Sequence, residues 1–240
     1  MTIADIPVAL LAGGLATRLQ PVTSTIPKAL VEVAGRPFID HQLELLYENG
    51  IRRVVLCIGH LGEQIQSHLG DGRSHGMEIS YAFDGPFLLG TGGAIRRALP
   101  LLGELFWVMY GDSYMDIAYP TILDYFQSVS ATGLMTVIKN DNQWDRSNAE
   151  FRDGRLLNYN KRQITPAMSY IDYGVALLRR SAIDPLPVDR PSDLADVYSR
   201  LVANGEMIGY EVHQRFYEIG TPAGLEDTRR YLQHRLTTRK

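Results

Sequence analysis

Short apolar runs alternate with segments of helical spacing along the first half of the chain. The apolar runs predict strands over residues 8–12, 53–58, 79–83 and 106–110. Apolar residues at helical spacing predict helices over residues 39–48, 63–69 and 92–99. This alternation of strand and helix is typical of parallel strands joined by right-handed crossovers. The strand runs are continuously apolar, which predicts a sheet covered by helices on both faces.

The second half is richer in strand patterns. Strands are expected over residues 134–139, 149–151, 155–159, 173–178, 209–212 and 216–219. Helices are expected over residues 192–204 and 222–235. We interpret this half as a continuation of the first sheet with added β elements, within one domain over residues 1–240. The predicted fold class is therefore α/β, with a Rossmann-like doubly wound, mostly parallel sheet.

Composition narrows the class of protein. The 240 residues are 45% hydrophobic, enough to bury a large core. With 24 basic and 27 acidic side chains the net charge is −3, which gives no general attraction for nucleic acid or anionic lipid. The longest apolar stretch, residues 99–110, is interrupted and too short to cross a bilayer, so no membrane partner is expected. Cys57 is the only cysteine and the first residues lack a basic signal-peptide region, so we expect a cytoplasmic protein.

The candidate chemistry begins where the first strand ends, at Gly13-Gly14. In open α/β sheets ligands bind beyond the carboxyl ends of the strands. Two glycines there allow backbone N–H groups to approach a phosphate, and Arg18 supplies a forked cation for phosphoryl oxygens. A tight turn with a surface arginine explains the same residues. Neither GxGxxG nor GxxxxGK[ST] occurs, which disfavours the usual dinucleotide and P-loop sites.

A longer pattern suggests a family. Leu11-Ala12-Gly13-Gly14, followed by Thr17-Arg18-Leu19 and Pro27-Lys28-Ala29-Leu30, resembles the signature of the sugar-1-phosphate nucleotidyltransferases. Residues 33–39, 89–94, 111–112 and 216–221 are similar to further motifs of that family. Within it, the chain resembles most the short bacterial guanylyltransferases that act on D-glycero-D-manno-heptose 1-phosphate. Uridylyltransferases acting on muramic acid phosphates come next.

The resemblance implies a reaction and a division of the chain. A sugar 1-phosphate attacks the α-phosphorus of a nucleoside triphosphate, most simply GTP, giving an NDP-sugar for surface polysaccharide and pyrophosphate. Two polyanions must be aligned, so cations and Mg²⁺ are expected in the cleft. Residues 1–130 then form the nucleotide-binding half and residues 131–240 the sugar-phosphate-binding half.

The resemblance also implies catalytic residues. Arg18 is expected on the triphosphate, and Lys28 is expected near the α-phosphate and the nucleophile. Asp112 follows a predicted strand and is the expected Mg²⁺ ligand, since a hard cation prefers carboxylate oxygens. Glu218 stands where family members usually carry aspartate, and it is the candidate second ligand. Simpler interpretations remain for each residue: Asp112 caps a turn, Lys28 lies on the surface, and Glu218 orients its loop.

Binding residues are carried over in the same way. The nucleotide-binding candidates are Leu11, Ala12, Gly13, Gly14, Thr17, Arg18, Asp84, Gly90, Thr91 and Gly92. The sugar-phosphate-binding candidates are Lys161, Asp172 and Gly174. Asn160 and Arg162 flank Lys161 where the family usually has an acidic residue and a proline. Asp84-Gly85 also suits a turn with no binding role.

Other functions remain open at this point. One is a non-catalytic regulatory subunit that senses a nucleotide sugar. Others are a uridylyltransferase for N-acetylmuramate 1-phosphate, or a transferase of the same fold acting on a molybdopterin cofactor or phosphocholine. The six histidines show no zinc-ligand spacing. The nucleobase, the sugar and the oligomeric state, a homo-oligomer included, are not determined by the pattern.

Overall fold

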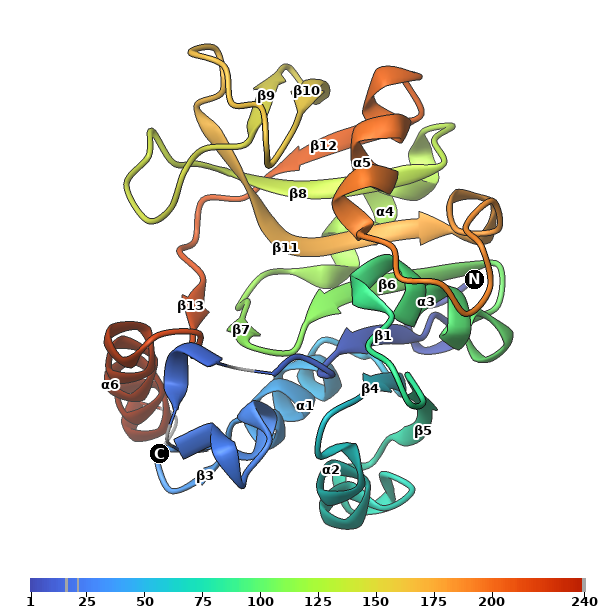
Figure 1. Ribbon diagram of the computed structural model, residues 1–240. Helices are drawn as coiled ribbons and strands as arrows, with labels where there is room; N and C mark the ends of the chain where they lie inside the picture. Colours follow the sequence, from blue (N-terminus) through green and yellow to red (C-terminus); the bar gives the residue numbers. More distant parts are fainter. Residues whose placement is uncertain (16, 21, 239–240) are drawn as a thin grey trace.

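A computed structural model describes residues 1–15, 17–20 and 22–238. Within them a nine-stranded sheet has the order β5-β4-β1-β6-β11-β8-β12-β10-β9 (Figure 1). Its first four strands are β1 (Val8–Leu11), β4 (Arg53–Ile58), β5 (Glu78–Phe83) and β6 (Leu105–Tyr110). These four pair in parallel, as predicted from the strand–helix alternation.

The remaining five strands extend the same sheet and change its character. They are β8 (Gly133–Lys139), β9 (Ala149–Arg152), β10 (Arg155–Tyr159), β11 (Tyr170–Arg179) and β12 (Met207–Glu211). The long strand β11 runs antiparallel to both β6 and β8, and only β12 and β8 pair in parallel in this half. The parallel arrangement therefore belongs to the first half, and the added β elements form a mixed extension.

Helices cover both faces of the sheet. On one face lie α1 (Phe38–Glu48), α2 (Gly62–Leu69) and α4 (Tyr119–Ser128), and on the other lie α3 (Gly90–Leu102) and α5 (Leu194–Ala203). Successive strand residues point to opposite faces, so Leu10 joins the core under α1 while Ala9 joins the core under α3. This double covering explains the continuously apolar strands.

A smaller assembly lies beside the sheet. Strand β2 (Glu32–Val33) pairs with β3 (Arg36–Pro37), and β7 (Ser113–Tyr114) pairs with β13 (Tyr217–Glu218). The last helix, α6 (Pro222–Thr238), packs against both pairs through a third apolar cluster. Figure 1 shows α6 beside the segment that follows β1, so the last helix packs near the carboxyl ends of the parallel strands.

No helix in the described part of the chain is long and apolar enough to span a membrane. Helix α4 was not among the predicted elements. It begins at Tyr119 with Pro120 at its second position, a place that tolerates the missing N–H group.

Candidate active site

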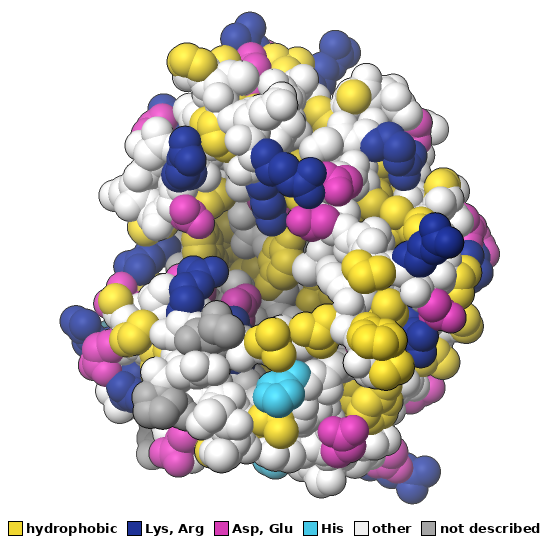
Figure 2. Space-filling model, in the orientation of Figure 1, with side chains coloured by type: hydrophobic (Ala, Val, Ile, Leu, Met, Phe, Trp, Pro, Cys, Tyr) yellow, Lys and Arg dark blue, Asp and Glu magenta, His cyan; other side chains and the backbone are white. Residues whose placement is uncertain are grey.

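Two cavities meet at the carboxyl ends of the parallel strands. The first encloses about 210 Å³ beside the ends of β1, β4 and β6. The second encloses about 800 Å³ between the end of β6, the strand β11 and the β13–α6 segment. Tyr110 and Asp112, at the end of β6, line both cavities. Figure 2 shows this face hollowed near its middle, with Lys and Arg side chains on the rim of the hollow.

The end of β1 is shaped by close backbone packing. A Cβ atom on Gly13 would lie 3.0 Å from the backbone nitrogen of Gly59, so the neighbouring strand end leaves no room for a side chain. Gly14 has nothing within 4 Å of the same position and lines the first cavity. Gly13 therefore serves packing between strand ends, and Gly14 leaves backbone exposed to the cavity.

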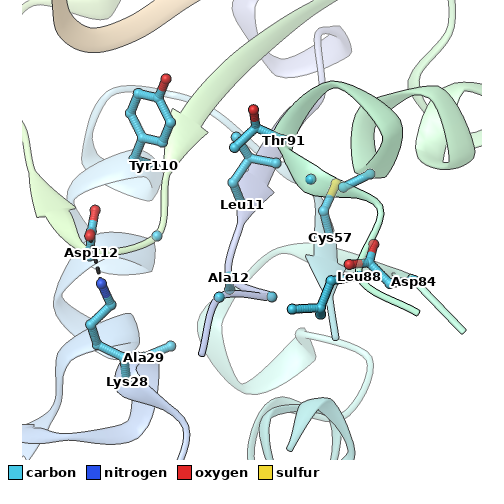
Figure 3. Close-up of a pocket in the computed structure, with 15 residues that line it drawn as sticks. Leu11, Ala12, Lys28, Ala29, Cys57, Asp84, Leu88, Thr91, Tyr110 and Asp112 are labelled. Atoms are coloured by element: carbon cyan, nitrogen blue, oxygen red, sulfur yellow. Dashed lines mark hydrogen bonds and ion pairs between the residues drawn. The ribbon is translucent and has the colours of Figure 1, made fainter. Parts of the chain in front are cut away.

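Lys28 and Asp112 form an ion pair where the two cavities join. Lys28 opens the 3-10 helix Lys28–Leu30, directly after the rigid Pro27, and Asp112 follows β6. The Lys28 Nζ lies 2.7 Å from the Asp112 Oδ2 (Figure 3). Both side chains are partly buried, with 21% and 31% of their surfaces exposed. The cavity therefore contains a lysine and a carboxylate that a bound polyanion or a cation can contact.

Glu218 is brought to the same place by the β7–β13 pair. Glu218 lies opposite Ser113, and the backbone N–H of Ile219 donates to the Asp112 carbonyl at 2.9 Å. Burial and the neighbouring Asp112 carboxylate raise the pKa of Glu218, while the charges of Arg18 and Lys28 oppose that rise. Two carboxylates and two cations from distant parts of the sequence thus influence one another electrostatically.

The chemistry of this group suits a hard divalent cation held jointly with phosphate. Asp112 and Glu218 offer carboxylate oxygens, which Mg²⁺ prefers, and Mg²⁺ is commonly bound by one or two carboxylates together with substrate phosphates. Within the described residues, no group of three or more His, Cys, Asp or Glu side chains could hold a metal by itself. A metal at Asp112 and Glu218 would therefore take its other ligands from substrate or water.

Asp84 lies at the opposite end of the first cavity from the Lys28–Asp112 pair (Figure 3). Its Oδ2 accepts a hydrogen bond from the Leu89 N–H at 3.2 Å. Its Oδ1 is buried and has no partner within the described residues. Burial raises the pKa of Asp84, an effect opposed by the Leu89 N–H and by the positive charge of Arg97. Since buried polar groups are normally hydrogen-bonded, Oδ1 is an unsatisfied acceptor of a residue that lines this cavity.

The glycines at the start of α3 have a packing role. A Cβ atom on Gly90 would lie 2.7 Å from the Ser192 carbonyl oxygen, and one on Gly92 would lie 3.0 Å from the Ser192 hydroxyl. The Thr91 hydroxyl donates to Asp193 at 3.1 Å and accepts from the Leu194 N–H at 2.9 Å. Gly90 and Thr91 line the first cavity as well, whereas Gly92 is not among its lining residues.

In the second cavity, Lys161 and Asp172 lie side by side. The Lys161 Nζ is 3.9 Å from Asp172 Oδ2 and donates to the Tyr110 hydroxyl at 3.4 Å. Burial opposes the charge on Lys161, but Asp172 and Tyr110 raise its pKa above the usual value. Asp172 is almost fully buried, and burial raises its pKa while Lys161 lowers it. The N–H of Gly174 donates to Asp172 Oδ1 at 3.0 Å, and this hydrogen bond holds the carboxylate in the wall of the cavity.

The predicted site residues thus divide between the two cavities. The first is lined by Leu11, Ala12, Gly13, Gly14, Lys28, Asp84, Gly90, Thr91 and Asp112. The second is lined by Arg18, Asp112, Lys161, Asp172, Gly174 and Glu218. The side chain of Thr17 lies outside the described part of the chain. Tyr110, Trp144, Arg146 and Arg215 also line these cavities and were not predicted.

A family model for nucleotidyl transferases matches residues 8–147, more than half of the chain. The chain is 26% identical over 224 residues to a UTP–glucose-1-phosphate uridylyltransferase of Synechocystis, covering 82% of this chain and 55% of that protein. It is 40% identical over 123 residues to an N-acetylmuramate alpha-1-phosphate uridylyltransferase of Neisseria meningitidis, covering 51% and 52% of the two chains. The chain matches about half the length of these curated relatives.

The fold has counterparts among solved structures. HddC from Yersinia pseudotuberculosis, complexed with GMP-PN, superposes with a TM-score of 0.78 over 95% of this chain and 99% of that one. The sequence identity is 22%, so this likeness concerns the fold. A protein crystallised with GMP-PN therefore shares the α/β fold of this chain.

Proposed function

Because the chain belongs to the nucleotidyl transferase family, we propose that it transfers a nucleoside monophosphate from a nucleoside triphosphate to a sugar 1-phosphate. The products are an NDP-sugar and pyrophosphate. The observation that carries this proposal is the position of Lys28, Asp112 and Glu218 at the junction of two cavities. A transfer between two phosphorylated substrates needs both to meet at one charged centre.

In this proposal the first cavity holds the nucleotide. Its base end lies at Asp84, and its phosphate end lies at Lys28 and Asp112, as the separation in Figure 3 suggests. Gly14 presents backbone near the phosphates, and Arg18 binds the triphosphate from the second cavity. Lys28 neutralises charge at the α-phosphate as the sugar phosphate oxygen attacks. The transfer is direct and needs no covalent intermediate on the protein, so alignment and charge neutralisation supply most of the catalysis.

The second cavity holds the sugar 1-phosphate. The ammonium of Lys161 binds its phosphate, and the Asp172 carboxylate accepts hydrogen bonds from sugar hydroxyls. Gly174 has a φ of +102°, and a Cβ atom there would lie 3.2 Å from the Tyr110 ring, so glycine is favoured at this bend. Residues 1–130 therefore supply the nucleotide side, and residues 131–240 supply the sugar side.

Mg²⁺ is the metal we propose for Asp112 and Glu218. Bound there, it would neutralise phosphate charge and help orient the triphosphate. Glu218 replaces the shorter aspartate usual in the family, and its longer side chain reaches the same cavity from β13. Such substrates and a reduced Cys57 fit a cytoplasmic protein.

GTP is the nucleotide that the Asp84 environment supports best. An ionised carboxylate only accepts hydrogen bonds, and guanine offers adjacent N1–H and N2–H donors on one edge. The Asp84 side chain lines the first cavity, and its carboxylate would give such an edge an acceptor. The fold shared with HddC, whose crystals contained GMP-PN, supports the same choice. We propose heptose 1-phosphate as the acceptor on the resemblance described above.

One observation favours a second candidate. The stretch of 40% identity to the uridylyltransferase of Neisseria meningitidis covers about half of the chain. A uridylyltransferase acting on N-acetylmuramate 1-phosphate is therefore the alternative. Uracil offers a single ring N–H donor, which makes a weaker match to a carboxylate acceptor.

A substrate matrix tests the proposal directly. Pyrophosphate release is measured with each of the four nucleoside triphosphates against heptose, mannose, glucose and N-acetylmuramate 1-phosphates. Activity should appear with Mg²⁺ and vanish with excess chelator, and GTP with heptose 1-phosphate should give the highest kcat/KM. Faster turnover with UTP and N-acetylmuramate 1-phosphate supports the second candidate. No pyrophosphate from any pair refutes both.

A further inference from the structure

Trp144 is a large aromatic side chain set in the wall of the second cavity. It lies in the 140–148 segment between β8 and β9, and 36% of its surface is exposed. The chain has two tryptophans, and the other, Trp107, is fully buried in the core. The neighbours of Trp144 in sequence are polar, so a core position does not explain it.

The 140–148 segment is held by buried polar side chains. Asn140 and Ser147 are 2% and 0% exposed. The Asn140 Nδ2 donates to the Ser147 hydroxyl at 3.0 Å and to the Asp145 carbonyl at 2.7 Å. The Asn140 Oδ1 accepts the backbone N–H of Trp144 itself at 3.1 Å. Since buried polar groups cost free energy unless they are bonded, these contacts fix one loop conformation and with it the position of Trp144.

Trp144 belongs to a continuous aromatic wall. Its ring lies 6.1 Å from that of Phe216 in an edge-on arrangement, and Phe216 lies 5.7 Å from Tyr173 in the same way. All three line the cavity that contains Lys161 and Asp172. An aromatic wall and a cation–carboxylate pair in one cavity match a ligand with an apolar face, polar edges and a negative charge.

We propose that Trp144 is the surface on which the sugar ring of the acceptor packs, and that the 140–148 segment therefore determines acceptor specificity. This inference rests on the proposed function. A pyranose ring presents C–H groups on its faces and hydroxyls around its edge. The faces pack on an aromatic ring, while the hydroxyls are left to carboxylates such as Asp172. A preformed platform of this kind binds with little ordering cost.

The kinetic test separates the two substrates. The acceptor that turns over fastest in the matrix above is used. Trp144→Ala should raise the KM for the sugar 1-phosphate about tenfold and leave the KM for the nucleoside triphosphate within about twofold. Trp144→Phe should restore most of the loss, because it retains an aromatic face. Leu157→Ala removes an exposed apolar side chain of β10 outside both cavities and serves as the control.

A binding measurement gives a readout independent of turnover. Trp107→Phe leaves Trp144 as the single tryptophan, so its fluorescence reports on this cavity alone. Titration with that sugar 1-phosphate should change the emission, whereas inorganic phosphate at the same concentration should not. If the Trp107→Phe protein is poorly folded, the wild type and Trp144→Phe are compared instead.

The outcomes are distinct. The role of Trp144 is overturned if Trp144→Ala leaves the acceptor KM unchanged or raises the KM of both substrates equally. It is also overturned if inorganic phosphate gives the same emission change as the sugar 1-phosphate. In each case, turnover still supports the proposed function. Absence of turnover with every acceptor refutes the proposed function itself, and the inference falls with it.

Discussion

The ammonium of Lys28 lies 2.7 Å from the carboxylate of Asp112, although 84 positions separate the two residues in the sequence. Both face the place where the two cavities join. Both side chains keep some contact with solvent, and a partly solvated ion pair contributes little to folding stability, about 1 kcal/mol at most. In the proposed reaction, this ammonium and this carboxylate act together at a phosphate group.

Asp112→Asn should reduce kcat by about 10²- to 10³-fold or more, because a neutral amide cannot balance the charge of a divalent cation or fix Lys28. The fold should persist, since Asp112 is 31% exposed and its backbone carbonyl still accepts from Ile219. Steady-state kinetics and a thermal melt check the two parts. A variant with nearly normal turnover would remove Asp112 from the reaction.

Glu218→Asp should retain much of the activity and Glu218→Gln should lose it, if a carboxylate at this position binds metal. The two substitutions separate charge from size, because aspartate keeps the charge and glutamine keeps the length. Turnover is measured over a range of Mg²⁺ concentrations, and Glu218→Asp should require more Mg²⁺ for half-maximal rate. Equal activity in both variants would assign Glu218 a structural role on β13.

Arg18→Ala should weaken nucleotide binding and slow the reaction together, while Lys28→Ala should slow the chemical step more than it weakens binding. Loss of one charge-assisted hydrogen bond to phosphate corresponds to about ten- to a hundredfold. For Lys28→Ala, kcat and kcat/KM should fall by similar factors. Steady-state kinetics with both substrates varied measure the effect on the chemical step, and calorimetry measures the effect on nucleotide binding.

Lys28→Arg is the matched control for that experiment. A planar guanidinium does not replace a compact ammonium beside Asp112, so little rescue is expected. Wild-type binding and turnover in Lys28→Ala would instead show that the lysine takes no part in the site.

Asp84→Asn should lower kcat/KM for GTP about tenfold or more and affect UTP less, because the amide presents donors where guanine also has donors. The measurement is the ratio of kcat/KM for GTP to that for UTP, with the same sugar 1-phosphate. An unchanged ratio would show that the base is read elsewhere.

The difference in folding stability between Asp84→Asn and the wild type should also depend on pH. Burial raises the pKa of Asp84 in the folded state, so the folded protein holds this proton more tightly than the unfolded chain. The wild type therefore loses stability as pH rises from the unfolded pKa through the raised folded pKa. The asparagine variant lacks this loss, so its stability relative to the wild type should increase from pH 3 upward and then level off. Denaturant unfolding at several pH values tests this, with the exposed Asp124→Asn as control, and a constant difference would contradict it.

Local sequence pattern predicted the first half of the fold well. The run over residues 53–58 coincides with β4, and the helix predicted over 39–48 is α1 with one more residue at its start. Asn49 and Gly50 end that helix, with Gly50 at φ of +86°, where glycine is favoured. These elements depend on neighbouring residues, so a linear pattern contains them.

Features that depend on contacts between residues far apart in the sequence were harder to predict. Nothing local indicates that β11 inserts antiparallel between β6 and β8, because that choice depends on packing across residues far apart in sequence. The aromatic wall was missed for the same reason, since Trp144 and Phe216 meet only in the fold. One signal was available: Trp144 stands alone in a polar segment, a place where a large aromatic residue calls for a binding explanation.

The short pair β7–β13 has a consequence for biosynthesis. Chains fold from their N-terminal side as they emerge from the ribosome, and residues 8–112 already contain the parallel strands, Lys28 and Asp112. Glu218 emerges more than a hundred residues later, at the end of β13, and the N–H of the next residue, Ile219, donates to the Asp112 carbonyl. A nascent chain therefore contains every residue that lines the first cavity before Glu218, which lines the second cavity, has been translated. The Ile219–Asp112 hydrogen bond can form only after β13 has been made, so a chain that stops short of β13 leaves the second cavity without the Glu218 carboxylate.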